Sequence, residues 1–147
     1  PGLVDLVPSG HIKISGCPNG CGQHHIASIG FQGSVRKLGP RAVPQYFVLV
    51  GGGCADEGTA HFGKVVSKVP VHRLTDALDR LLGLYRDHRQ GDEELGAFFR
   101  RVPASMATDA LKDLSQLLPN EATDQDFIDL AETQAFTPEV MDGECSA

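Results

Sequence analysis

Two cysteines separated by three residues, Cys17 and Cys21, are the side chains of this sequence best suited to hold an inorganic group. They lie in the stretch GCPNGCG, between a strand-like run and what reads as a short helix at residues 22–27. A thiol at such a junction faces unpaired backbone N–H groups and the positive end of a helix dipole. Both favour the thiolate, the form that binds metal, so the pair is predicted to bind a metal centre.

Other interpretations of these cysteines remain open. Cysteine is among the most buried residue types, so the pair could be packing residues or a disulfide. The flanking glycines argue against a packing role, because they leave bare backbone around the sulfurs. Zinc held by Cys17, Cys21 and His24, with His25 adjacent, would place the ligands on one helix face, whereas zinc sites usually combine two separated pairs. A redox dithiol usually has two intervening residues.

A 4Fe-4S cluster normally takes four thiolates, and this sequence does not supply a second well-spaced pair. Cys54 falls in a predicted polar loop at residues 54–62, and Cys145 falls in a predicted loose tail at residues 136–147. The chain also begins at Pro1 without an initiator methionine. We therefore expect a fragment of a longer protein, with the missing cysteine pair upstream of it.

The composition indicates a globular domain and argues against nucleic-acid-binding, membrane-spanning and secreted disulfide-rich proteins. The 147 residues suffice for one domain with a hydrophobic core, and 41% of them are hydrophobic. A formal charge of -6, without a basic stripe, argues against nucleic-acid binding. We find no apolar run long enough to span a membrane and no signal-peptide pattern. The irregular cysteine spacing is unlike a secreted disulfide scaffold and favours a cytoplasmic location.

The hydrophobic pattern predicts an α+β fold, in which a small mixed sheet is covered by helices from residue 71 onward. Strands are expected near residues 11–16, 26–35, 45–51 and 63–69, with a loop at 36–44. Helices are expected at residues 70–91, 92–101 and 105–118. Thr123 and Asp126 resemble a capping box for a short helix that carries Phe127, Leu130 and Ala131.

The residues around the cysteines resemble a known signature. The segment SGCPNGC at residues 15–21, followed after six residues by SIGF at 28–31, resembles the siroheme and 4Fe-4S binding signature of the nitrite and sulfite reductase family. The similarity continues in the family's order through residues 46–52, 62–65, 70–91 and 94–102. It therefore covers roughly residues 10–102.

This resemblance implies a function. Cys17 and Cys21 match the second of the family's two cysteine pairs, so both would bind a 4Fe-4S cluster, and the Cys21 sulfur would also bridge to the siroheme iron. The family reduces the small anions sulfite to sulfide or nitrite to ammonia with six electrons from ferredoxin or a flavoprotein. Ser28 departs from the pattern, because the family usually carries an acidic residue there.

Two hypotheses from different classes follow. In the first, residues 1–118 are the C-terminal siroheme and cluster domain of a sulfite or nitrite reductase, and residues 119–147 are an acidic extension. This domain would be inactive without the remainder of the reductase chain. In the second, the chain is a stand-alone iron–sulfur electron-transfer or metal-binding module that a partner completes. Arg36, Lys37 and Arg41 are the nearest basic cluster and are expected to be a solvated loop.

Overall fold

Four segments rich in β-branched and aromatic residues form the main sheet of this computed structural model, which describes residues 5, 7, 10–54 and 58–138. The strands are β1 (Ile12–Ser15), β2 (Ile29–Leu38), β3 (Arg41–Val50) and β6 (Lys64–Pro70), in the order β1-β2-β3-β6. β1 pairs with β2 in parallel, and the other two pairings are antiparallel. The predicted small mixed sheet is therefore confirmed.

The predicted loop at residues 36–44 is wrong, because β2 and β3 form one long hairpin that turns at Gly39 and Pro40. Tertiary contacts extend the strands. The Arg36 guanidinium donates to the Gln45 side chain and to the main-chain oxygens of Ser115 and Lys68. Pro40 and Pro44 had suggested a loop, because proline often interrupts strands. The long-range hydrogen bonds of Arg36 instead stabilise paired strands here.

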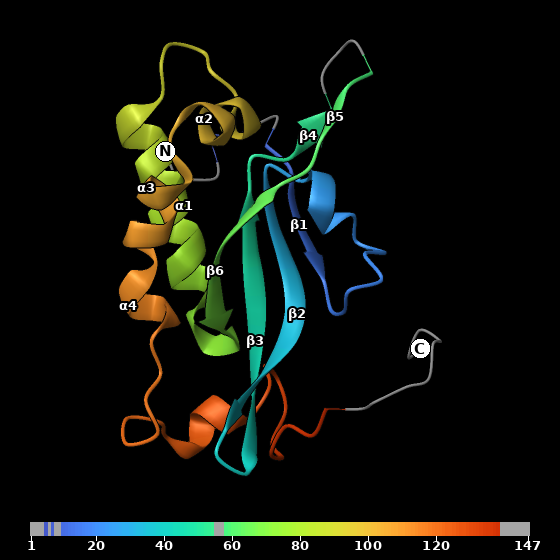
Figure 1. The fold of residues 1–147 in the computed structure, drawn as a ribbon, viewed down its shortest axis with the longest axis vertical. Helices are drawn as coiled ribbons and strands as arrows, with labels where there is room; N and C mark the ends of the chain where they lie inside the picture. Colours follow the sequence, from blue (N-terminus) through green and yellow to red (C-terminus); the bar gives the residue numbers. More distant parts are fainter. Residues whose placement is uncertain (1–4, 6, 8–9, 55–57, 139–147) are drawn as a thin grey trace.

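Helices cover one side of this sheet, as Figure 1 shows. They are η3 (Val71–Arg73), α1 (Leu74–His88), α2 (Leu95–Arg101), α3 (Ala104–Ala110) and α4 (Lys112–Ser115). The predicted apolar stripe of α1 is buried at Ala77, Leu81, Leu82 and Tyr85. The helix expected at residues 105–118 is interrupted at Leu111, where φ is -104° and ψ is 0°, and it ends at Ser115. The α+β fold, with helices covering a sheet, is confirmed.

The segment after α4 crosses below the β2–β3 hairpin (Figure 1) and packs against it. Phe127 and Leu117 join buried Val43 in a second apolar cluster, and the Arg41 guanidinium lies 3.6 Å from the Phe127 ring centroid. The Thr123–Asp126 capping box is confirmed, although the helix that it begins, η4 (Asp124–Phe127), is a 3-10 turn. That helix ends before Leu130 and Ala131.

Phe136 does not belong to a loose tail, as had been predicted for residues 136–147. The Phe136 backbone N–H donates to the Phe127 carbonyl oxygen at 2.6 Å, so residue 136 belongs to the folded segment. Residues 139–147, and Cys145 with them, lie outside the described residues. The boundary after residue 118 stays a prediction.

The predicted polar loop at residues 54–62 contains a second small sheet. β4 (Gly53–Cys54) pairs with β5 (Ala60–His61), and residues 55–57 between them lie outside the described residues. Cys54 is thus the end of a strand and not a loop residue. Among the helices described here, none is long and apolar enough to cross a membrane.

Candidate functional site

The cysteine turn, residues 16–23, leaves the end of β1 and is closed by backbone hydrogen bonds. Ser15 is buried at the last position of β1, and its hydroxyl accepts a hydrogen bond from the Gly22 N–H at 3.1 Å. The Gln23 N–H donates to the Gly20 carbonyl oxygen at 2.7 Å. Gly20 and Gln23 both adopt positive φ, which reverses the chain sharply here. Residues 16–23 therefore form a hydrogen-bonded turn and do not extend strand β1.

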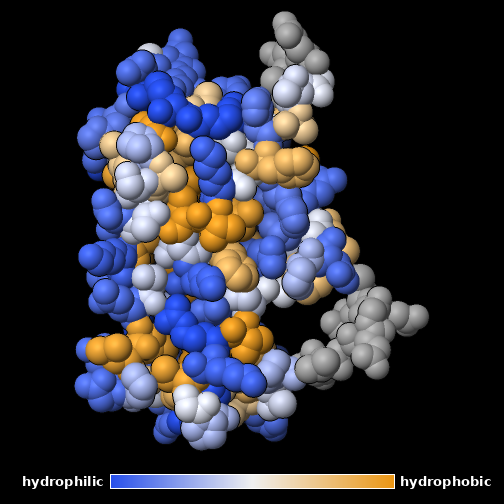
Figure 2. Space-filling view, in the orientation of Figure 1, coloured by the Kyte–Doolittle hydropathy of each residue, from blue (hydrophilic) through white to orange (hydrophobic). Residues whose placement is uncertain are grey.

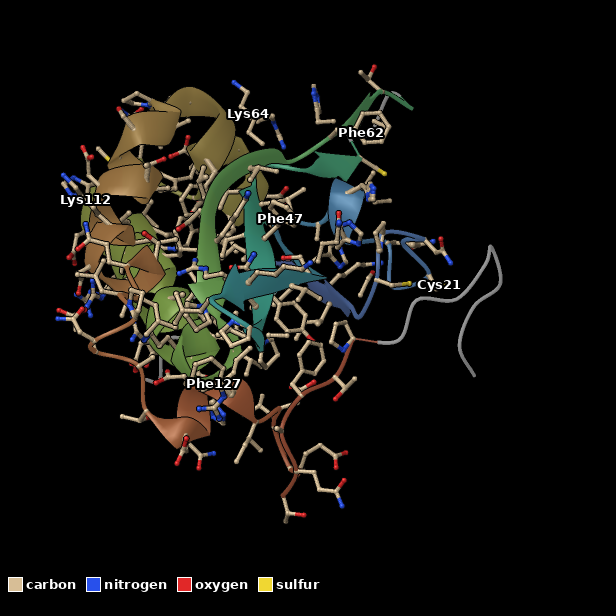
Figure 3. The ribbon with its side chains drawn as sticks, turned by 60° about the horizontal axis from the view of Figure 1, so that its bottom comes forward. Cys21, Phe47, Phe62, Lys64, Lys112 and Phe127 are labelled. Atoms are coloured by element: carbon tan, nitrogen blue, oxygen red, sulfur yellow. The ribbon has the colours of Figure 1, made fainter. Side chains whose placement is uncertain are left out.

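Both thiols of the turn face solvent. Cys17 and Cys21 are exposed and form no disulfide, and Figure 3 shows Cys21 on a loop beyond the edge of the sheet. The alternatives in which the pair is buried packing or a disulfide are therefore wrong for this structure. Two exposed, unpaired thiols on one tight turn remain available to an external electrophile, a metal ion or a cluster.

The helix predicted at residues 22–27 is a single 3-10 turn, η2 (His24–Ile26). The His25 carbonyl oxygen accepts from the Gly63 N–H at 2.7 Å, so it is not available to continue a helix. A three-residue 3-10 turn has no appreciable macrodipole. The expected stabilisation of a thiolate by a helix N-terminus therefore has no structural basis here.

His24 lies beneath the turn and is completely buried. Its Nε2 is 3.0 Å from Gln32 Oε1, and its ring centroid is 3.8 Å from that of His25. Burial lowers the pKa of His24, and the neighbouring His25 lowers it further, whereas the Gln32 hydrogen bond acts in the opposite direction. His24 is thus a buried ring whose Nε2 is already engaged and whose lowered pKa favours the neutral form.

This placement disfavours the zinc alternative. The cysteines are exposed whereas His24 is buried, and no helix places the three on one face. Within the described ranges, no three or more His, Cys, Asp or Glu side chains converge as they would around a metal ion. Donors from the described residues alone would not complete a tetrahedral site.

Glycines set the position of the turn against β2, which sequence analysis missed. A Cβ on Gly33 would lie 2.0 Å from the Gly16 carbonyl oxygen, and a Cβ on Gly30 would lie 2.2 Å from the His24 carbonyl oxygen. Both distances are far inside van der Waals contact, so only glycine allows the two backbones to approach. Glycine inside a strand is a recognised sign of such an approach, and this signal could have been read from the SIGFQGSV stretch.

Comparison with known proteins identifies the family. Residues 10–102 match the model of the nitrite and sulphite reductase 4Fe-4S domain. The chain belongs to this family. The match covers the cysteine turn, the main sheet, α1 and α2, which is the range over which the sequence resemblance extends.

Individual relatives support the same family assignment. The chain is 33% identical over 94 residues to a sulfite reductase [NADPH] hemoprotein beta-component of Pectobacterium carotovorum, covering 64% of this chain and 15% of that protein. It is 35% identical over 92 residues to the corresponding protein of Nitrobacter hamburgensis, covering 62% of this chain and 14% of the relative. The chain thus spans only a small part of these relatives.

A solved structure supports the same fold. The NirA protein of Mycobacterium tuberculosis superimposes with a TM-score of 0.57 and 28% sequence identity. The superposition covers 66% of this chain and 18% of that protein. The described fold is therefore that of a nitrite and sulfite reductase domain.

Proposed function

We propose that this chain is the part of a siroheme-dependent sulfite or nitrite reductase that helps to bind the 4Fe-4S cluster and the siroheme. Cys17 and Cys21 would supply two of the four cluster thiolates, and Cys21 would be the residue that links the cluster to the siroheme. One observation supports this most strongly: two exposed, unpaired thiols lie on one hydrogen-bonded turn inside the region matched by the family.

The residues of this chain fit one half of such a site. Thiolates are the ligands of a 4Fe-4S cluster, and four of them are needed. The turn offers two exposed thiols, and the Ser15–Gly22 hydrogen bond closes the loop of backbone that carries both. When bound, the cluster would store electrons and deliver them to the siroheme for the six-electron reduction of sulfite or nitrite.

The remainder of the reductase chain is the proposed partner. It would supply the other cysteine pair and the basic residues that hold the anion and the siroheme carboxylates. A ferredoxin or a flavoprotein would supply electrons in the cytoplasm. On this proposal the isolated chain is catalytically silent, because a cluster held by only two thiolates is not stably coordinated.

Replacement of Cys21 by Ser in the full-length reductase tests the assignment. We expect reduction of the anion to fall below detection, because the bridge between cluster and siroheme is lost. Iron content, acid-labile sulfide and the visible spectrum should be measured together with activity. Cys54→Ser is the matched control, since Cys54 is also exposed and free but lies outside the turn. Full activity of Cys21→Ser with an intact siroheme spectrum would refute the role of Cys21.

Metal analysis of the isolated chain, purified without oxygen, separates this proposal from the stand-alone module. A colourless protein without bound metal is expected if the site is split between two segments. A brown protein with roughly equal iron and sulfide would instead favour a module that completes its own cluster, as two copies or with further cysteines. Stoichiometric zinc would favour a structural metal site.

A further inference from the structure

A cavity of about 310 Å³ lies at the end of the sheet where β3 runs into three consecutive glycines. Its wall combines the start of β1, the Gly52–Cys54 segment and α2. The polar groups that face it include the side chains of His11, Lys13, Ser28, Glu94 and Arg100. A second cavity, of about 350 Å³, also has Arg100 in its wall, together with His61 and Lys64. Cations thus gather at this end of a chain that is acidic overall.

Arg100 differs from its neighbour Arg101. The Arg101 guanidinium bonds to both carboxylate oxygens of Glu93, at 2.7 and 2.8 Å. Arg100 donates only through Nη1, to the carbonyl oxygens of Gly51 and Gly52 at 3.0 and 3.3 Å. Among the described residues, neither its Nε nor its Nη2 has a hydrogen-bond partner, and no carboxylate forms an ion pair with it. Nη1 is therefore held by two carbonyl oxygens, while the part of the chain that the structure describes offers no partner to the other N–H donors.

Other charged arginines of the protein emphasise this difference. Arg41, Arg80 and Arg86 each form an ion pair with an aspartate. Lys13, which faces the same cavity as Arg100, donates to the neutral Gln23 amide oxygen at 2.8 Å. Glu94 is the single carboxylate facing the cavity from the described residues, and it is exposed. The described wall of the cavity thus contains two cationic side chains, Lys13 and Arg100, and one exposed carboxylate, Glu94.

The close approach of Gly96 on α2 to Gly52 brings two donors of the cavity near each other. A Cβ on Gly96 would lie 2.7 Å from the Gly52 carbonyl oxygen, 3.1 Å from Arg100 Nη1 and 3.3 Å from the Ser28 hydroxyl. Ser28 is 7% exposed, and its hydroxyl oxygen lies 3.5 Å from the His11 backbone N–H, from which it accepts. The hydroxyl proton therefore remains available to a ligand. Gly96 therefore lets α2 approach the Gly52 backbone closely, which brings the buried Ser28 hydroxyl and the Arg100 guanidinium to the same wall of the cavity.

We propose that this cavity binds a small, doubly charged oxyanion of the sulfate or phosphate type, at a site separate from the cysteine turn. A guanidinium presents parallel N–H groups that match two oxygens of such an anion, and a charge-assisted hydrogen bond is stronger than a neutral one. The Ser28 hydroxyl donates to a third oxygen, and Lys13 adds long-range attraction. A carboxylate on a larger molecule shares this chemistry, so the experiment must separate the two sources. The proposal does not depend on the cluster.

Titration of the ¹⁵N-labelled protein with sodium sulfate, at constant ionic strength set with sodium chloride, tests this site. We expect saturable shifts of the Gly52 and Gly96 amide resonances with sulfate and no such shifts with chloride alone. Arg100→Gln should weaken sulfate binding by at least about tenfold, because a charge-assisted bidentate contact is lost. Arg101→Gln is the matched control and should leave binding unchanged, since Glu93 already occupies that guanidinium.

Three results would overturn the proposal. Equal sulfate affinity of Arg100→Gln and the parent protein would remove the guanidinium from the site. Shifts that stay linear with concentration would mean the absence of a specific site. Saturation by citrate but not by sulfate would assign the cavity to a carboxylate carried by a larger molecule. If Arg100→Gln fails to fold, Lys13→Gln replaces it, and unchanged affinity of that folded variant would likewise reject the site.

Discussion

The helical layer and the cysteine turn both pack against β2, but different atoms hold them there. The helices contact β2 through side chains, since Ile29 and Phe31 belong to the buried core together with Phe98. The turn contacts β2 through backbone, since Gly30 and Gly33 leave room for the carbonyl oxygens of His24 and Gly16. Gly30 points to the face opposite Ile29 and Phe31, because successive residues of a strand point to opposite faces. Gly33 follows the last β2 residue that pairs with β1, where the chain turns away at Gly16.

Because of this difference, the helical layer and the cysteine turn should tolerate different substitutions. A core of apolar side chains tolerates exchange of similar shapes, because its stability depends on buried area and volume. A backbone-to-backbone contact tolerates no side chain at all. Glycines, which have no side chain, thus position the turn that presents Cys17 and Cys21. The two cysteines are exposed and do not belong to the hydrophobic core. Figure 2 shows hydrophobic and hydrophilic residues side by side on one face of the molecule.

The largest expected effect is in the helical layer. Phe98 is completely buried on α2 and packs edge-on against Tyr85 and Phe99, with ring centroids 5.5 and 4.9 Å away. Phe98→Ala should cost about 3–5 kcal/mol of unfolding free energy in urea titrations, because it removes buried area and leaves a cavity. Phe62→Ala, at a residue 73% exposed, should change stability by less than about 0.5 kcal/mol. Similar losses for both would mean that α2 is not part of the core.

A smaller effect on the unfolding free energy should distinguish alanine at Gly33 from alanine at Gly83. Gly33→Ala should destabilise the protein by about 1–3 kcal/mol, because its Cβ would displace the backbone before Cys17. Gly83→Ala, in α1 with no atom within 4 Å of its Cβ position, should stabilise the protein by roughly 0.5–1 kcal/mol through helix propensity. Urea unfolding and the rate of thiol labelling should be measured. Unchanged labelling in Gly33→Ala would show that the turn does not depend on this contact.

The smallest expected effect is a pH dependence beneath the turn. Burial lowers the folded-state pKa of His24 below its ordinary value of 6.5, so the folded protein binds fewer protons at this site than the unfolded chain. His24 therefore contributes stability above pH 6.5 that is lost as pH falls through its folded pKa. His24→Gln should flatten the change in unfolding free energy between pH 7 and pH 5. An identical slope in the variant would mean that His24 is not responsible for it.

Local sequence patterns predicted the strongly periodic elements well. The aromatic and β-branched run at residues 45–50 is the end of β3, and the stripe of residues from Leu74 to Tyr85 lies on the buried side of α1. Such patterns succeed because burial of one face decides the structure. They failed at residues 36–44 and 22–27. There, hydrogen bonds from Arg36 to Ser115 and from Gly63 to His25 come from residues distant in sequence.

The sequence by itself determined the family, the α+β class and the two thiols that form the candidate cluster site, because spacing and glycine content of the GCPNGCG turn are local properties. Only the tertiary structure decided the surroundings of those thiols. It buried His24 against Gln32, and it paired Arg101 with Glu93 whereas, among the described residues, Arg100 bonds only to the carbonyl oxygens of Gly51 and Gly52. Neighbouring residues of identical type diverged because hydrogen-bond partners depend on which chain segments meet in space.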